Sequence, residues 1–196
     1  DIASMHPTSA IVMNYFGEYT VRFKAIKDAR VAIKRCDLKR AKEILSIFIS
    51  EKDLDIYLAD KKTAKGLAQA LKIAINSVYG LTAASFPNAF RDERNVNNIV
   101  ALRGALFMRT LRDEIEARGY SIVAIKTDSI KIAEADEEII AFCMDFARKY
   151  GYEFEHEATY TRMCQVNDAD YVALEDGKWT ATGKMFQIPY VFKTLF

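Results

Sequence analysis

The spacing of apolar and polar positions predicts two long helices in the first half of the chain. In residues 19–50 apolar side chains recur at helical spacing, and the same period runs through residues 61–79, after which Gly80 is expected to end the helix. Basic side chains share a separate stripe on the first segment, and Lys65, Lys72, Asn76 and Tyr79 share one on the second. The two segments therefore predict an antiparallel helical hairpin with a basic face.

Two further helices are predicted in the second half. Residues 96–118 have a helical apolar pattern that closes at Gly119. A fourth helix is expected to begin after Asp136, whose side chain can cap the first turn, and to end at Gly151.

Extended segments are predicted around these helices. Residues 1–13 are short and extended in character, because Pro7 disfavours helix at the residue before it. Residues 123–132 have two apolar runs around a polar tip, which predicts a β-hairpin. Residues 158–166 and 170–182 have strand patterns, and an Asp-Gly pair inside the second has the composition of a tight turn. The order of elements predicts an α+β fold, with a mostly antiparallel sheet backed by helices and an inserted helical hairpin.

Composition excludes several classes of protein. A chain of 196 residues with 51% hydrophobic content can bury a good core. Its three cysteines are widely spaced and form no Cys-x-x-Cys pair, which argues against a disulfide framework or a structural zinc site and fits a reducing cytoplasm. Apolar runs fall well short of the roughly 20 residues of a membrane span, and the opening residues do not have the pattern of a signal peptide. A soluble cytoplasmic protein is expected.

Charge is unevenly distributed although the formal net charge is only +1. Residues 22–42 contain nine basic and two acidic residues, whereas residues 134–157 contain eight acidic and two basic residues. The first region would attract phosphates, although a solvated helix face explains such a run equally well.

Three short motifs carry the functional signal. The segments are DIASMHPTS at residues 1–9, KIAINSVYG at residues 72–80 and TDS at residues 127–129. Their order and spacing resemble the three polymerase motifs of family B DNA polymerases, and Lys-x-x-x-Asn-Ser-x-Tyr-Gly is matched in full. The chain is similar to the palm and fingers of a phage-type member of that family.

The resemblance implies a division of the chain. Residues 1–16 would be the first motif strand of the palm, 17–82 the fingers hairpin, 83–165 the rest of the palm, and 166–196 the end of the palm and start of the thumb. It also implies an excised segment, with the exonuclease or other N-terminal parts and most of the thumb missing. A phage-encoded protein would act in the host cytoplasm.

The implied activity is template-directed DNA synthesis, in which a primer 3′-hydroxyl attacks the α-phosphate of a deoxynucleoside triphosphate and pyrophosphate leaves. Such a transfer depends on positioning and on two divalent ions bridged by carboxylates. The resemblance implies Asp1 and Asp128 as the catalytic carboxylates, with the backbone carbonyl of Ile2 as a further ligand. The expected cofactor is Mg²⁺, for which Mn²⁺ can substitute.

Other positions are implied to bind the incoming nucleotide. Lys72 and Asn76 lie one helical turn apart and would face the triphosphate, as would Arg30 and Lys34 from the other helix of the hairpin. The nucleotide-binding set expected from the resemblance is completed by Ser4, Met5, His6 and Tyr79. His6 stands where the family usually has a tyrosine that blocks a ribose 2′-hydroxyl, so weaker exclusion of ribonucleotides is expected. For each of these residues an ordinary packed or solvated helix position is the alternative.

The hairpin departs from the family pattern Asp-Thr-Asp-Ser, because Lys126 replaces the first acid. One interpretation is that Asp1 and Asp128 suffice and that Lys126 contacts a primer phosphate or helps neutralise the triphosphate. The other is a degenerate site that serves as a structural or DNA-holding module of a replication complex. We favour the first, because the triphosphate-facing positions are intact.

Primer–template DNA is the expected macromolecular partner, bound mainly through its phosphates. Lys126, Thr127 and Tyr171 are the candidate DNA contacts. Tyr171 belongs to a Lys-x-Tyr element of the family whose lysine is replaced here by Ala169. A different palm nucleotidyltransferase, such as a reverse transcriptase, is disfavoured by the complete motif at residues 72–80.

Overall fold

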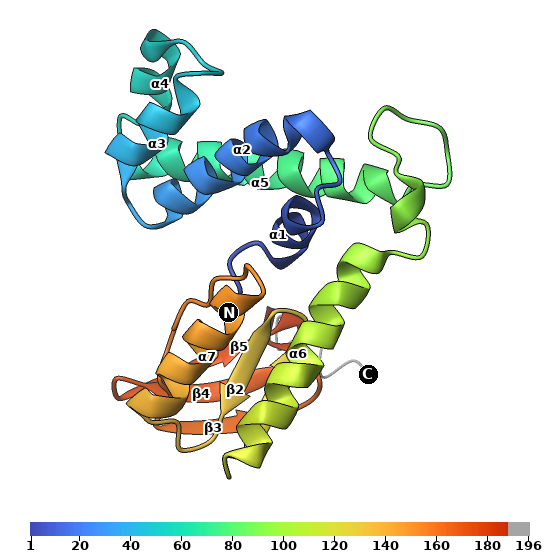
Figure 1. The fold of residues 1–196 in the computed structure, drawn as a ribbon. Coiled ribbons are helices and arrows are strands. Elements are labelled where there is room, and N and C mark those ends of the chain that lie inside the picture. The colour runs from blue at the N-terminus through green and yellow to red at the C-terminus, as the bar shows by residue number, and fades with distance from the viewer. Residues whose placement is uncertain (188–196) are drawn as a thin grey trace, which may run out of the picture.

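The computed structural model describes residues 1–187 and shows a helical lobe above a second lobe of helices and strands (Figure 1). The helices are α1 (Met5–Val12), α2 (Thr20–Lys34), α3 (Leu38–Leu45), α4 (Glu51–Tyr57), α5 (Lys61–Thr82), α6 (Ile99–Ala117), α7 (Glu137–Lys149) and α8 (Lys184–Gln187), with 3-10 turns η1 (Gly17–Tyr19) and η2 (Glu93–Asn95). The strands are β1 (Ile122–Lys126), β2 (Ser129–Ile132), β3 (Arg162–Gln165), β4 (Tyr171–Glu175) and β5 (Lys178–Thr182). The predicted α+β class is confirmed.

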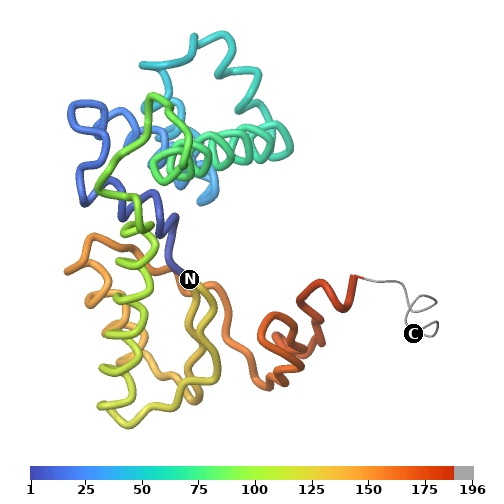
Figure 2. The backbone as a smooth tube through the Cα atoms, turned by 90° about the vertical axis from the view of Figure 1, so that its right-hand side faces the viewer, coloured from blue at the N-terminus to red at the C-terminus, as the bar shows by residue number. Residues whose placement is uncertain are grey.

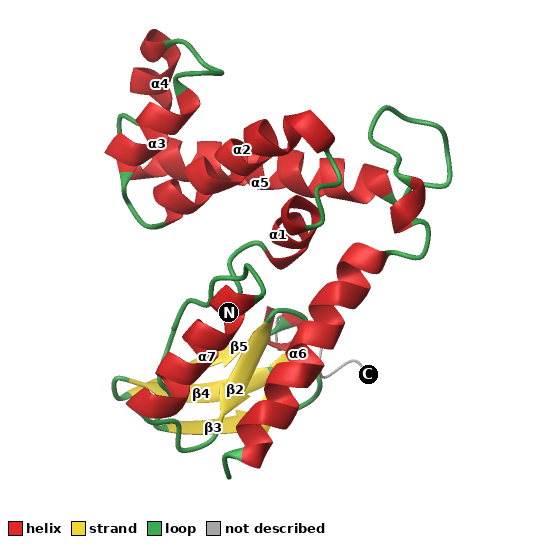
Figure 3. Cartoon of the chain, viewed as in Figure 1, coloured by secondary structure: helices red, strands yellow, loops and turns green. Residues whose placement is uncertain are grey.

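The strands form two small antiparallel sheets where one mostly antiparallel sheet was expected (Figure 3). β1 pairs with β2 as the predicted hairpin, and β3, β4 and β5 form a three-stranded sheet in that order. The Asp-Gly turn between β4 and β5 is confirmed, because Asp176 and Gly177 both have positive φ angles. The segment that carries β3–β5 extends to one side of the lobe formed by α6 and α7 (Figure 2).

The helical lobe is the expected hairpin with an additional tip. α2 and α5 run antiparallel side by side, and α3 and α4 fold back at their far end (Figure 1). The prediction of one helix over residues 19–50 was wrong. Cys36 has a φ of 61°, and the Asp37 side chain accepts a hydrogen bond from the Arg40 N–H to start a new helix. The break lets Ala29 and Ile33 share a buried cluster with α3 and α4.

Two other local predictions were also wrong. α5 continues beyond Gly80 to Thr82, because Gly80 does not have the positive φ of a terminating glycine. Residues 1–13, predicted to be extended, contain helix α1 from Met5 to Val12, and within them only Ile2 makes a strand-like bridge, to Phe154. Pro7 lies in the first turn of α1, where its missing N–H would have no intrahelical partner.

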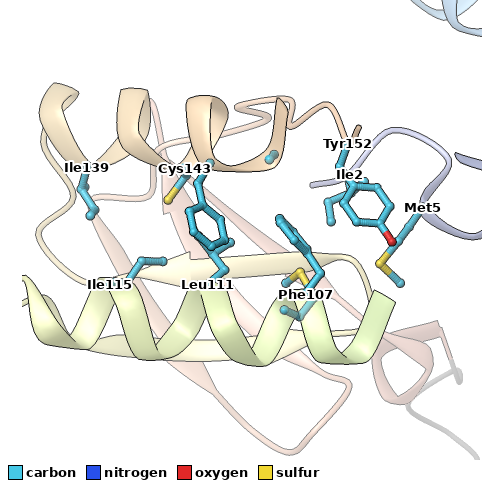
Figure 4. Packing of buried hydrophobic residues seen from close by; sticks show 11 residues of the cluster. Ile2, Met5, Phe107, Leu111, Ile115, Ile139, Cys143 and Tyr152 are labelled. Carbon is cyan, nitrogen blue, oxygen red and sulfur yellow. The ribbon is translucent and has the colours of Figure 1, made fainter. Parts of the chain in front are cut away.

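The core of the second lobe lies between α6 and α7 and against the β1–β2 hairpin. Figure 4 shows Leu111 and Ile115 of α6 facing Ile139 and Cys143 of α7. Ile2 and Met5 enter the same cluster from the opening of the chain. The predicted limits of α7 are confirmed, because the Asp136 side chain accepts from Ile139 N–H and Gly151 follows with a φ of 78°. No described helix is long and apolar enough to cross a bilayer.

Candidate active site

The opening residues join the hairpin to a distant part of the chain. The Ile2 N–H donates to the Asp128 carbonyl at 2.8 Å, while on the other side the Ala3 N–H donates to the Glu153 carbonyl at 2.9 Å. The Glu155 N–H donates to the Asp1 carbonyl at 2.8 Å. The Ile2 side chain is only 2% exposed, so core burial holds this segment in place. Asp1 is thereby fixed beside the tip of the β1–β2 hairpin.

Two adjacent cavities meet at this point. The helix-side cavity, of about 340 Å³, lies between the hairpin tip and the helical lobe. The hairpin-side cavity, of about 330 Å³, lies between the hairpin, α7 and the segment that leads into β3–β5. Asp1, Thr127 and Asp128 line both cavities.

The helix-side cavity brings together most of the residues singled out by the three motifs. Its lining includes Asp1, Ile2, Ser4, Met5, His6, Arg30, Lys34, Lys72, Asn76, Thr127 and Asp128. Their positions in the chain range from 1 to 128, so the fold and not local sequence creates this gathering. Tyr79 contacts the set through His6, whose ring stacks on the Tyr79 ring at a centroid distance of 5.1 Å and an angle of 14°.

Asp1 and Asp128 differ in what the structure shows of them. Asp1 Oδ1 is buried and has no hydrogen-bond partner among residues 1–187, which leaves a buried acceptor unsatisfied in this part of the protein. Asp128 follows Thr127 at the hairpin tip, where Lys126 pairs with Ser129 and Thr127 has a φ of 51°. No group of three or more Asp, Glu, His or Cys side chains suited to a metal occurs in residues 1–187. A cation here would rely on two carboxylates and backbone oxygen.

The cationic side chains around the cavity differ in their partners. Arg30 Nη1 donates to Ser4 Oγ at 2.7 Å, and burial lowers the pKa of Arg30. Lys34 Nζ contacts Glu155 Oε2 at 2.6 Å and Glu157 Oε1 at 3.2 Å, and the hydrogen bond to Glu155 raises its pKa. The side chain of Lys72 makes no hydrogen bond or ion pair with a described residue, so its charge is free to meet an anion.

His6 occupies a partly buried position between the two lobes. Burial lowers the pKa of His6, and the charge of Asp128 only partly offsets this effect. Its Nδ1 is buried and has no hydrogen-bond partner in the described part of the chain. Tyr79 is held in turn by its hydroxyl, which donates to Asn98 Oδ1 at 2.8 Å. The imidazole is therefore favoured in its neutral form at one wall of the cavity.

Lys126 and Tyr171 line the other cavity, on the hairpin side. Lys126 Nζ lies 3.4 Å from the Ala169 carbonyl oxygen. Lys126 thus lines a different cavity from Arg30, Lys34 and Lys72, which line the helix-side cavity.

Sequence reasoning missed an ionic cluster between the lobes. Lys34 and Arg35, at the end of α2, pair with Glu153, Glu155 and Glu157. The available signal was the complementary charge of the 22–42 and 134–157 regions, together with acids at every second position of an extended segment. Part of the basic run is therefore matched by the chain's own acids.

Comparison with known proteins gives one partial match. No protein-family model matches the chain. An 84-residue stretch is 37% identical to DNA polymerase II of Escherichia coli K12. The match covers 41% of this chain and 10% of that protein, so the chain corresponds to a small part of its relative. The similarity supports a relationship to a DNA polymerase region.

Proposed function

We propose that this chain is the catalytic palm and fingers segment of a family B DNA polymerase. It would add a deoxynucleotide from its triphosphate to a primer 3′-hydroxyl on a DNA template, with release of pyrophosphate, in DNA replication. The observation that carries the proposal is the gathering of three separate motifs around one cavity, which Asp1, Asp128, Lys72 and Asn76 all line. The similarity to DNA polymerase II supports the same activity.

The lobes would have distinct roles in this proposal. The helical lobe, α2 to α5, would be the fingers, and α6, α7 and the β1–β2 hairpin would form the palm. The expected start of a thumb within residues 166–196 lies partly outside the described residues, which end at 187.

The acidic pair fits a divalent cation, because Asp1 has a buried carboxylate oxygen without a partner. Asp1 and Asp128 would hold Mg²⁺, or Mn²⁺ in its place, with the Ile2 carbonyl as a further ligand. Two such ions supply charge stabilisation for the attacking and leaving oxygens of a phosphoryl transfer.

The protein's own cations would position the triphosphate. Lys72 and Asn76 project into the cavity from α5, and Arg30 does so from α2 while bound to Ser4. Cations on two helices can neutralise a polyanion together, which favours binding with the reacting phosphate near the carboxylates. Met5, His6 and Tyr79 would contact the sugar and base.

The primer–template would occupy the hairpin side. Lys126, Thr127 and Tyr171 line that cavity and would contact the DNA backbone next to Asp128. A strand end and a nucleotide would then approach the carboxylates from opposite sides.

Primer extension by the full-length protein tests the activity. Asp128→Asn keeps the shape of the side chain but removes its charge, and it should abolish addition of a single nucleotide to a labelled primer. Asp176→Asn, in the β4–β5 turn, is the matched control and should leave extension unchanged. Extension that persists in Asp128→Asn would refute the proposal.

A second candidate is a non-catalytic module that holds DNA within a replication complex. It is favoured by Lys126 at the hairpin and by the absence of a three-ligand acidic cluster in the described residues. Binding of a deoxynucleoside triphosphate that depends on Mg²⁺ distinguishes the two, because a holding module has no need of such a site.

A further inference from the structure

The hairpin-side cavity contains two lysines without acidic partners. Lys131 of β2 places its Nζ 4.5 Å from the centroid of the Tyr171 ring, a cation–π contact. The Nζ of Lys126 of β1 lies 3.4 Å from the Ala169 carbonyl oxygen. Neither ammonium forms an ion pair with any residue in the described range 1–187. Both charges are therefore available to an external anion.

Two phenol groups lie beside these lysines. The Tyr160 and Tyr171 hydroxyls are 3.3 Å apart, and this hydrogen bond raises the pKa of Tyr160 to about 12. Burial alone would raise the pKa of Tyr171, but hydrogen bonds with Tyr160 and Thr182, followed by the charges of Lys131 and Lys126, together lower it. The lysines thus create a positive potential at this wall of the cavity.

The acids that face the same cavity do not cancel this potential. Glu155 and Glu157 line the cavity, but both are paired with Lys34, and Glu155 also contacts Arg35. Their charges are thereby compensated from the helical lobe. Asp1 and Asp128 also line this cavity, and the proposed divalent cations would neutralise them.

We propose that Lys131, together with Lys126, binds a backbone phosphodiester of the nucleic-acid strand whose end lies at Asp128. This inference rests on the proposed function and adds Lys131 to its DNA-binding residues. A phosphodiester is favoured over the triphosphate because the cations suited to the triphosphate line the other cavity. Contacts through single ammonium groups to phosphate carry no base information, so binding at this site is independent of sequence.

The salt dependence of DNA binding tests the assignment. A fluorescent primer–template duplex, without nucleotide, is titrated with the full-length protein at several salt concentrations. Loss of one phosphate contact reduces the slope of log affinity against log salt by about 0.9. Lys131→Gln should show that reduction, and Lys131→Arg, which keeps the charge, should restore the original slope.

Lys149→Gln is the matched control, because Lys149 is exposed at the end of α7 and does not line the cavity. It should leave the slope unchanged. An unchanged slope in Lys131→Gln, or an equal loss in Lys149→Gln, would overturn the inference. Weaker binding of the nucleotide with an unchanged DNA slope would also overturn it, because it would place Lys131 at the triphosphate.

The experiment separates this inference from the proposed function. If Asp128→Asn still extends primers while the Lys131 variants change the salt slope as expected, the catalytic assignment fails and the phosphodiester site stands. If Asp128→Asn abolishes extension and Lys131→Gln leaves the salt slope unchanged, the phosphodiester site is wrong and the catalytic assignment stands.

Discussion

At the scale of single residues, the site combines unsatisfied groups that a ligand would satisfy. Within residues 1–187, Asp1 Oδ1 and His6 Nδ1 are both buried without partners, and the Lys72 side chain has no counter-charge. Buried polar atoms without partners are costly in a folded protein, so their concentration at one cavity favours a binding role. The motif residues could be predicted from sequence because their spacing is specific. The opposite charges of two regions indicated that they could pair, but the particular partner of Lys34, Glu155 at 121 positions away, depends on the fold.

His6 gives a prediction about sugar selection. An imidazole is smaller than a phenol and lacks its hydroxyl, so His6→Tyr should narrow the space beside the sugar. We expect the ratio of kcat/KM for deoxynucleotides over ribonucleotides to rise in His6→Tyr. Steady-state incorporation of the two sugars opposite the same template base measures this ratio. An unchanged ratio would show that His6 does not control sugar choice.

At the scale of elements, the sequence predicted those helices and strands whose ends are determined by capping or turn residues within the same segment. The Asp136 cap of α7 and the Asp-Gly turn of β4–β5 depend on neighbours in sequence, and both were predicted. α1 was missed because its formation depends on distant packing: Met5 lies against Gly104 of α6, where a Cβ would come within 2.8 Å of Met5 Cε. Tertiary contacts of this kind leave no periodic signal.

The Asp37 cap at the break between α2 and α3 should contribute measurably to the stability of the fold. The Asp37 carboxylate accepts from the Arg40 N–H at 3.1 Å and caps α3. Asp37→Ala should lower the free energy of unfolding by about 1 kcal/mol, because a helix N-terminal donor loses its partner. Urea unfolding measures the change. Glu43→Ala, an exposed position within α3, is the comparison, and an equal loss there would contradict the role of the cap.

At the scale of the whole molecule, the ionic cluster ties the helical lobe to the second lobe. Burial alone would raise the pKa of Glu155, but the hydrogen bond from Lys34 and the charges of Lys34 and Arg35 together lower it below its ordinary value of 4.5. An acid whose pKa is lowered on folding stabilises the fold above its unfolded pKa, and that stability is lost as the pH falls through the folded pKa.

Acid stability therefore depends on Glu155. Between neutral pH and pH values below 4.5, the wild-type protein should lose more thermal stability than Glu155→Gln, which has no charge to lose. Tm measured across this range by circular dichroism tests the difference. If Tm falls equally with pH in the two proteins, the ion pairs of Glu155 do not contribute to stability.

The same cluster has a consequence for nucleotide binding if Lys34 is a triphosphate ligand. Glu155 and an incoming triphosphate would compete for the Lys34 ammonium, which lines both the cluster and the helix-side cavity. Removing the competitor in Glu155→Gln should lower the Kd for a deoxynucleoside triphosphate several-fold at low salt, where charge pairs are least screened.

Glu153→Gln is the matched control, because Glu153 pairs with Arg35 and not with Lys34. Equilibrium binding of a fluorescent deoxynucleoside triphosphate measures the Kd of each variant. A Kd that stays the same or rises in Glu155→Gln would mean that Lys34 serves only to join the lobes, which would leave Lys72 and Arg30 as the cations at the phosphates.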